Sequence, residues 1–226
     1  MCPAALKAVI FDFDDTLVDT YAFFCHQLHQ TLIELYGPDY DHNYMVTAEM
    51  FYNQNMPFVE IFKKTFGENS GKTLRGYREK SSSAQYQAKP GMLDFVNFLV
   101  QQNIDRLILS NRTKLIKYRL TQAGFDPCQF RIFHAENKKP HPHAYAEVFK
   151  CLKHLGIKAE ETIIIGNHPD DFLALPDLYK AESLFIALPI NHQARKNFQK
   201  INEKAQQKIQ VYNHISELSN IYGRIF

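Results

Sequence analysis

The residues best suited to catalysis or metal binding lie at positions 12–17, Asp-Phe-Asp-Asp-Thr-Leu. They directly follow a nearly continuous apolar run at residues 7–11. Such a run predicts a strand buried on both faces of a parallel sheet. Ligand sites in open α/β sheets lie beyond the carboxyl ends of the strands, where Asp12 and Asp14 would stand. Because residues two apart in an extended chain project the same way, the two carboxylates can converge. One can attack an electrophile while the other transfers a proton, and the pair can also hold Mg²⁺.

Three further polar segments also follow apolar runs or precede helices. Ser110 and Asn111 come after three aliphatic residues and offer a hydroxyl and backbone N–H groups suited to phosphate oxygens. Lys139 supplies a cation in a Pro-flanked loop, and residues 166–171, Gly-Asn-His-Pro-Asp-Asp, offer more oxygen ligands. Taken alone, each segment fits a helix cap, a solvated loop or a turn, and the acidic pair fits a surface turn equally well. Their succession after buried strands favours one shared site.

The elements that would position these residues alternate along the chain. Further apolar runs lie at residues 107–109, 163–165 and 184–188, and stretches with helical spacing lie at residues 93–100, 115–123 and 145–152. Strand alternating with helix predicts an α/β fold, with a Rossmann-like parallel sheet flanked by helices and joined by right-handed crossovers.

Residues 20–89 interrupt this alternation. Amphipathic helices are predicted around residues 23–35, 45–52 and 58–66, followed by a polar stretch at residues 71–89 whose helix is weakly specified. We interpret the segment as a helical insertion between the first two strands. The predicted organisation is therefore an α/β core of residues 1–19 and 90–226 that carries a small α-helical cap domain of residues 20–89.

The composition is that of an ordinary folded globular protein, with 45% hydrophobic and 22% charged residues, which excludes a disordered or low-complexity chain. The formal net charge of +2 gives no electrostatic basis for capture of nucleic acid or of an anionic membrane. The longest apolar runs are shorter than a membrane span, the N-terminus lacks a signal-peptide pattern, and the four cysteines form no C-x-x-C pair. We expect a cytoplasmic monomer or homodimer that binds neither nucleic acid nor membrane.

These motifs resemble those of the haloacid dehalogenase superfamily, specifically its phosphatase-like members with a helical cap after the first motif. Phosphoglycolate phosphatase-like and β-phosphoglucomutase-like proteins are members of this kind. The resemblance covers nearly the whole chain, from the D-x-D-x-T strand end through the cap, Ser110 and the K-P-x-P loop to the last glycine motif. It implies a Mg²⁺-dependent phosphatase that hydrolyses a small phosphorylated metabolite, a phosphate monoester, through an aspartyl-phosphate intermediate.

The same resemblance implies a role for each motif residue. Asp12 would be the nucleophile, and Asp14 would protonate the leaving group and then activate water. Ser110 and Lys139 would act with them on the transferring phosphoryl group. The phosphate-binding set would be Thr16, Ser110, Asn111 and Lys139, with Thr16 also supporting the loop. The metal ligands would be Asp12, Asp14 through its backbone carbonyl, Asn167 and Asp171. Because members that displace halide do not keep the second aspartate, Asp14 favours phosphate chemistry over dehalogenation.

One residue departs from the family pattern. An aspartate usually follows the glycine of the last motif as a metal ligand, and this chain has Asn167 there. The amide removes one negative charge, which Asp170 or Asp171 is left to compensate, so weaker Mg²⁺ affinity is expected. Two alternatives to the phosphatase stay open. They are a phosphomutase of the same fold and a catalytically weak member that binds a phosphorylated ligand or a protein. The sequence does not distinguish among phosphate esters.

Overall fold

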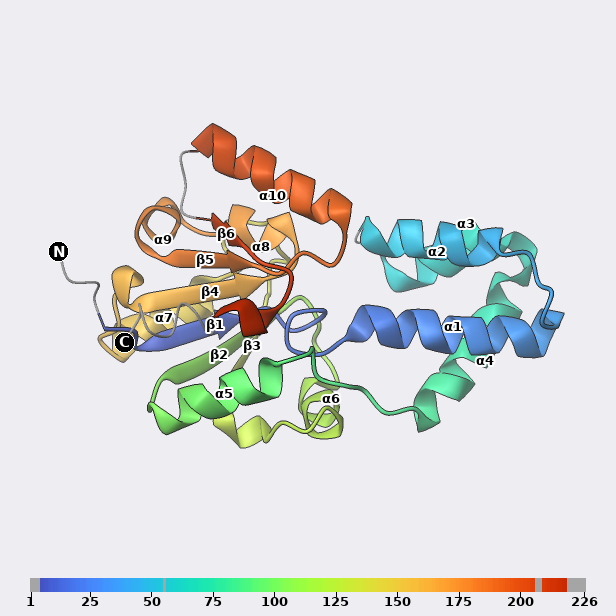
Figure 1. Cartoon of the computed structure of the whole chain (residues 1–226), viewed down its shortest axis with the longest axis horizontal. Coiled ribbons are helices and arrows are strands. Elements are labelled where there is room, and N and C mark those ends of the chain that lie inside the picture. The colour runs from blue at the N-terminus through green and yellow to red at the C-terminus, as the bar shows by residue number, and fades with distance from the viewer. Residues whose placement is uncertain (1–4, 55, 206–208, 219–226) are drawn as a thin grey trace. The chain divides into compact units, whose positions relative to one another are not determined.

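The computed structural model describes residues 5–54, 56–205 and 209–218. The chain divides into two compact units, which are labelled by element in Figure 1. One unit contains the described residues of Met1–Val18 and Ala88–Phe226, and the other consists of Asp19–Gln87. Every residue predicted to do chemistry belongs to the first unit.

The first unit is built on a six-stranded sheet in the order β3-β2-β1-β4-β5-β6. The strands are β1 (Ala8–Phe11), β2 (Asp105–Ser110), β3 (Arg131–His134), β4 (Thr162–Gly166), β5 (Leu184–Ala187) and β6 (Ile209–Val211). All neighbouring strands are parallel. The neighbours of β1 are β2 on one side and β4 on the other, so later strands of the chain are added to both sides of the first strand. The predicted α/β class with a Rossmann-like parallel sheet is confirmed.

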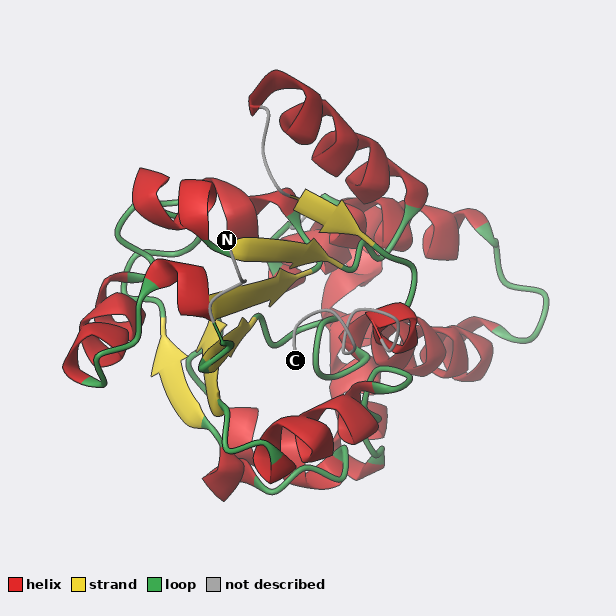
Figure 2. Cartoon of the chain, turned by 60° about the vertical axis from the view of Figure 1, so that its left-hand side comes forward, coloured by secondary structure: helices red, strands yellow, loops and turns green. Residues whose placement is uncertain are grey.

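Helices cover both faces of this sheet (Figure 2). They are α5 (Met92–Gln101), α6 (Ile116–Gln122), α7 (Ala146–His154), α8 (Pro169–Leu173), α9 (Asp177–Glu182) and α10 (His192–Ala205), with short 3₁₀ turns η2 (Pro127–Gln129), η3 (Ala159–Glu161) and η4 (Ile215–Leu218). Ile10 of β1 shares one buried cluster with Val148 of α7 and Phe198 of α10. On the opposite face Phe11 meets Phe95 of α5 with ring centroids 6.0 Å apart. Since β1 is fully buried on both faces, its continuous apolar sequence is explained.

The edge strands β3 and β6 were absent from the sequence prediction. The four residues of β3, Arg-Ile-Phe-His, are exposed or only half-buried. The three residues of β6 include one that is buried. An edge strand needs no apolar run because one of its sides has no neighbouring strand, so neither segment carries the pattern that marks the four central strands.

The described residues of the second unit form helices joined by loops and turns, with no strand among their named elements. They are α1 (Thr20–Tyr36), α2 (Asn43–Asn53), α3 (Phe58–Phe66), the 3₁₀ turn η1 (Gly67–Asn69) and α4 (Ser70–Ser83). Phe24 of α1 lies within ring contact of Tyr52, Phe58, Phe62 and Tyr77, which together form an aromatic core. The polar helix α4 contributes only two buried side chains to this unit, those of Thr73 and Tyr77, which explains its weak sequence signal.

Asp19 begins the first of these helices. Its Oδ1 accepts the backbone N–H of Ala22 at 3.2 Å, which satisfies one of the unpaired donors at the start of α1. Gly37, with φ 88°, ends the same helix in a conformation that favours glycine.

No helix in the described part of the chain has both the length and the apolar composition that a membrane crossing demands.

Candidate active site

The predicted motifs of the first unit meet at the carboxyl edge of its sheet. The last residue of β1 pairs with Ile108 of β2 and with Ile165 of β4. Asp12 follows directly and donates its N–H to the Ile165 carbonyl at 2.8 Å. It therefore lies between Ser110, the last residue of β2, and Gly166, the last residue of β4. The parallel sheet brings together side chains that are about 100 and 150 residues apart in the sequence, as the position of ligand sites in such sheets requires.

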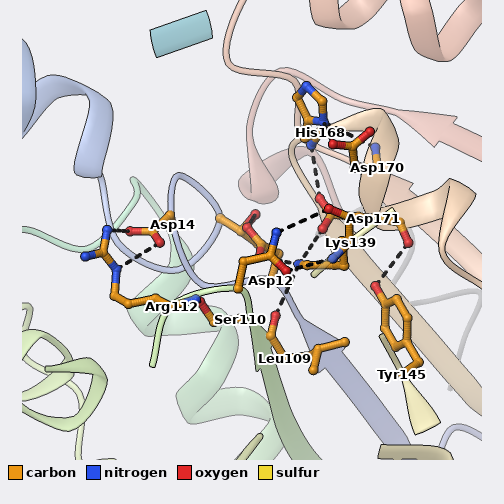
Figure 3. Close-up of polar contacts among 12 residues, drawn as sticks. Asp12, Asp14, Leu109, Ser110, Arg112, Lys139, Tyr145, His168, Asp170 and Asp171 are labelled. Atoms are coloured by element: carbon orange, nitrogen blue, oxygen red, sulfur yellow. Dashed lines mark hydrogen bonds and ion pairs between the residues drawn. The ribbon is translucent and has the colours of Figure 1, made fainter. Parts of the chain in front are cut away.

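Lys139 is at the centre of the site (Figure 3). Its Nζ lies 2.6 Å from Oδ1 of Asp12 and 2.6 Å from Oδ1 of Asp171. It also donates to the backbone carbonyl of Leu109 at 3.2 Å. Three acceptors match the three hydrogens of an ammonium group, so this cation is fully hydrogen-bonded although its side chain is only 3% exposed. The ammonium group of Lys139 thereby contacts carboxylates from two motifs that are distant in the sequence.

Burial and charge together determine the ionisation of this cluster. Burial raises the pKa of Asp12 to about 7, while the Lys139 ammonium opposes the rise and the Asp171 carboxylate adds to it. For Lys139 itself burial acts to lower the pKa, but Asp12 and Asp171 outweigh burial and the pKa is raised. Lys139 is therefore a cation at neutral pH, and Asp12 is a carboxyl group held close to its titration point. Strong perturbation of this kind is typical of functional sites.

Asp171 is fixed by contacts along its whole length. Its Oδ2 accepts the backbone N–H of His168 at 3.1 Å, and its backbone carbonyl accepts the hydroxyl of Tyr145 at 3.1 Å. Its side chain also packs against Gly166, where an added Cβ would lie 2.5 Å from Oδ2. Only glycine leaves enough space at that position, which explains the glycine of the last motif. Tyr145 was not predicted to belong to the site, since a buried tyrosine in a helical pattern indicates core packing.

Asn111 positions Lys139 through the backbone. Its Oδ1 accepts the N–H of Lys139 at 2.8 Å, and its Nδ2 donates to the Lys139 carbonyl at 3.5 Å. The hydroxyl of Ser110 accepts the N–H of Arg112 at 3.0 Å, which fixes the turn after β2. Ser110 is thus next to Asp12 at the sheet edge, as predicted, whereas the amide of Asn111 is already engaged in holding the lysine loop. The phosphate-binding roles of both residues stay predictions.

Thr16 belongs to the tight turn that follows β1. Its buried hydroxyl lies 3.5 Å from Oδ2 of Asp12. The turn closes when the N–H of Asp15 donates to the carbonyl of Val18 at 2.8 Å, and Asp15 takes a φ of 60°, which aspartate tolerates better than most residues. Thr16 therefore supports the loop beside the carboxylate of Asp12.

Asp14 has different partners from Asp12. Arg112 donates from Nε to Oδ2 of Asp14 at 3.1 Å and from Nη2 to Oδ1 at 3.0 Å. Nη1 of Arg119 lies 3.6 Å from the same Oδ1. In Figure 3 Asp14 and Arg112 lie on one side of Asp12, and Asp171 lies on the other. The two arginines were not predicted. The only sequence signal was the place of Arg112 directly after Ser110-Asn111 at a strand end.

The oxygen atoms around Lys139 form the candidate metal site. Asp12 and Asp171 supply carboxylates, and Asn167, which directly follows β4, is buried. An all-oxygen donor set of this kind suits Mg²⁺, and the backbone carbonyl of Asp14 could add to it. Among the described residues no three His, Cys, Asp or Glu side chains gather as a metal-binding group. The donors therefore fit magnesium in kind, with two carboxylates and one amide in place of three carboxylates.

Solved structures resemble this chain over nearly its whole length. A HAD-superfamily hydrolase of subfamily IA from Geobacter sulfurreducens is 18% identical and superposes with a TM-score of 0.62 over 96% of both chains. YfnB from Bacillus subtilis, in a crystal bound to magnesium, is 20% identical, with a TM-score of 0.67 over 97% of this chain and 100% of its own. CbbY from Rhodobacter sphaeroides, in complex with phosphate, is 18% identical, with a TM-score of 0.59 over 94% and 96%. At these identities the likeness shows the fold.

The family assignment comes from the sequence. No curated protein is significantly similar to the chain. Residues 9–175, which run from β1 past α8 and include all the motifs described above, match the haloacid dehalogenase-like hydrolase family. This is well over half of the 226 residues. The chain therefore belongs to the family of haloacid dehalogenase-like hydrolases and is an enzyme of that family.

Proposed function

We propose that this hydrolase is a Mg²⁺-dependent phosphatase that cleaves a small phosphate monoester through an aspartyl-phosphate on Asp12. The observation that carries the proposal is the contact between Lys139 and Asp12 at 2.6 Å, at a sheet edge that also presents Ser110. Phosphoryl transfer depends on positioning and charge neutralisation, which a carboxylate, an ammonium and a hydroxyl provide together. The similar folds of CbbY with phosphate and YfnB with magnesium are consistent with this chemistry.

The first step is attack of Asp12 on the substrate. One carboxylate oxygen forms a bond to phosphorus as the bond from phosphorus to the ester oxygen breaks. Asp14 gives its proton to the departing oxygen, which leaves as an alcohol. Lys139 and Ser110 hold the phosphoryl oxygens while charge moves onto them. Bound by Asp12, Asn167, Asp171 and the Asp14 carbonyl, Mg²⁺ would supply further charge neutralisation.

The second step returns the enzyme to its starting state. Asp14, now a carboxylate, takes a proton from water as the water oxygen attacks phosphorus. The bond from phosphorus to Asp12 breaks, which releases inorganic phosphate and restores the carboxylate. In a phosphomutase the acceptor would be a second hydroxyl of the substrate in place of water. We propose a small phosphorylated metabolite of the cytoplasm as the partner, with neither nucleic acid nor membrane involved.

The test is a phosphate-release assay over a panel of phosphate esters with Mg²⁺. We expect release by the wild type and a loss of at least about 10³-fold in Asp12→Asn, because the amide cannot form the intermediate. Asp105→Asn is the matched control, since Asp105 forms an ion pair with Arg131 at the opposite edge of the sheet. Release that persists in Asp12→Asn would contradict the proposed nucleophile.

Two other outcomes would identify the alternatives. Binding of a phosphorylated compound without any release would support the catalytically weak member, which the amide at Asn167 favours. Transfer of phosphate between two positions of one sugar would support the phosphomutase. Mass spectrometry of the rapidly quenched wild type should find one added phosphoryl group on the peptide that contains Asp12.

A further inference from the structure

Arg112 holds Asp14 in a two-pronged ion pair. The two donors, Nε and Nη2, each meet a separate carboxylate oxygen, at 3.1 and 3.0 Å. Parallel N–H···O bonds of this kind are among the stronger and more directional polar contacts in proteins. Both side chains are about one-third exposed, at 34% for Arg112 and 30% for Asp14. The pair is therefore ordered by its geometry yet accessible to a ligand from solvent.

The backbone of Arg112 is fixed on both sides. Its N–H donates to the hydroxyl of Ser110 at 3.0 Å. Its carbonyl lies 2.8 Å from Nδ1 of His134, the last residue of β3, and since a carbonyl only accepts, that nitrogen carries the hydrogen. The guanidinium thus extends from an anchored position two residues beyond the proposed phosphate ligand Ser110. The position of Arg112 is therefore determined by the carboxyl end of β2, which also positions Ser110.

The proposed reaction places Arg112 beside the leaving group. Attacking and leaving oxygens lie roughly in line through phosphorus, so the alcohol departs on the side opposite Asp12. Asp14 must reach that departing oxygen to protonate it, and its carboxylate contacts Arg112 through two hydrogen bonds and Arg119 at 3.6 Å. However, both oxygens of Asp14 accept hydrogen bonds from the guanidinium. Proton transfer therefore requires that another anion replace Asp14 on Arg112.

We propose that Arg112 binds a second anionic group, a carboxylate or a phosphate, on the alcohol part of the substrate. The guanidinium exchanges the Asp14 carboxylate for this group, so it keeps a two-pronged anionic partner. Asp14, released from the ion pair, takes up a proton from water and passes it to the ester oxygen. This inference rests on the proposed phosphatase function and names its substrate class, a phosphate monoester with a second negative group. Arg112 is thereby a specificity-determining residue, and an ester without such a group leaves Asp14 on Arg112.

The test compares matched esters that differ in the second anion. For the carboxylate, 3-phosphoglycerate is compared with glycerol 3-phosphate, and for the phosphate, fructose 1,6-bisphosphate is compared with fructose 6-phosphate. We expect the wild type to prefer the anionic member of one pair. Arg112→Gln should lower that ratio of kcat/KM about 10–100-fold, mainly through KM, because hydrogen bonds between two charged groups are lost. The pair that responds identifies the anion as carboxylate or phosphate.

Two variants control for charge and for structure. Arg112→Lys keeps the charge without the planar fork, so its ratio should lie between those of the wild type and Arg112→Gln. Arg131→Gln removes the exposed arginine that pairs with Asp105 and should leave the ratio unchanged. Thermal unfolding of each variant checks that it is folded. A wild type without preference, or an Arg112→Gln variant that loses both members of a pair equally, would overturn the inference.

Binding without turnover separates this inference from the proposed function. Calorimetric affinities of the same esters are measured for Asp12→Asn and for the Asp12→Asn, Arg112→Gln double variant. If the wild type releases no phosphate but the second substitution abolishes the preference in binding, the phosphatase proposal fails and the role of Arg112 stands. If Asp12→Asn binds neither ester of either pair, or binds both members of each pair equally, the role of Arg112 is wrong.

Discussion

An ion pair lies at each end of strand β1. The two pairs have equal N···O distances, but their lysines differ in exposure to solvent. At the amino end Nζ of Lys7 lies 2.6 Å from Oε1 of Glu161, and at the carboxyl end Nζ of Lys139 lies 2.6 Å from Oδ1 of Asp12. The Lys7 side chain is 52% exposed, whereas that of Lys139 is 3% exposed; their carboxylate partners Glu161 and Asp12 are similarly buried, so the contrast lies in the cations. The lengths alone would suggest that the two contacts are equivalent.

The difference in burial gives the two pairs different consequences. Water screens an exposed pair, so such a contact contributes only about 0–1 kcal/mol to folding. A buried pair has already lost its hydration, and removal of one partner leaves the other as an uncompensated charge. At the carboxyl end one ammonium also faces two carboxylates, Asp12 and Asp171. The buried cluster is therefore a costly arrangement, consistent with retention for chemistry and not for stability.

The largest expected effect comes from Lys139→Met. Loss of the ammonium leaves Asp12 and Asp171 buried beside each other without a cation, so the free energy of unfolding should fall by about 3–5 kcal/mol. Urea unfolding at pH 7.5 with EDTA measures this change. The loss should be smaller at about pH 5, where the Asp12 carboxyl, whose pKa is raised to about 7, can take up a proton. A loss below about 1 kcal/mol at pH 7.5 would contradict the contrast between the two ends.

Asp12→Asn should raise the free energy of unfolding, whereas Lys139→Met lowers it. The folded pKa of Asp12 is raised to about 7 from an ordinary value of 3.8, chiefly by burial. For a raised carboxyl pKa, stability is complete below the unfolded value and falls as the pH rises through the folded value. The amide avoids this loss, so its stabilisation should grow from about pH 4 and level off above about pH 7 at roughly 4 kcal/mol.

Urea unfolding of both proteins at several pH values, with EDTA throughout, measures this stabilisation. Asp105→Asn should give no comparable rise, because the Asp105 side chain is 34% exposed against 11% for Asp12 and so keeps more of its hydration on folding. The inactive variant would then be the more stable protein, as expected where a site sacrifices stability for function. A stabilisation that is independent of pH would show that the Asp12 carboxyl is not its source.

The central part of the fold follows directly from the sequence. Four apolar runs predict the four inner strands because a strand buried on both faces needs apolar residues at every position. The edge strand β3 and the polar helix α4 lack such patterns, since each places much of its length in contact with water. Their positions depend on neighbours that are distant in sequence, which local patterns do not record.

The sequence predicts that its motifs meet at one sheet edge, but it predicts neither their contacts nor the presence of Arg112, Arg119 and Tyr145 beside them. The positions of Asp12, Ser110 and Asn167 after buried strands place them at one sheet edge. The orientation of Asp14 does not follow from its spacing, because the chain leaves the strand at Asp12 and turns through the positive φ of Asp15. Its partner Arg112 is 98 residues away, so the ion pair exists only in the folded chain.

Asn167→Asp tests the role of charge at the buried, carboxyl end of β1. A third carboxylate restores one negative charge to the candidate metal site, so the half-saturating Mg²⁺ concentration should fall at least about tenfold, or about 1.4 kcal/mol. Calorimetry or the Mg²⁺ dependence of thermal unfolding measures it without any substrate. Asn191→Asp is the matched control, because the Asn191 side chain accepts the N–H of Ala194 at the start of α10. Unchanged Mg²⁺ affinity in Asn167→Asp would refute the charge argument.

The smallest effect is expected at the exposed end, from Lys7→Met. The change removes a contact of the same length as that of Lys139, yet the free energy of unfolding should fall by no more than about 1 kcal/mol. High salt separates the two cases further, because about 1 M NaCl screens an exposed pair and leaves a buried one nearly intact. The loss in Lys7→Met should therefore vanish at high salt while that in Lys139→Met persists. If both losses respond to salt equally, the site is hydrated in solution, and the raised pKa of Asp12 loses its physical cause.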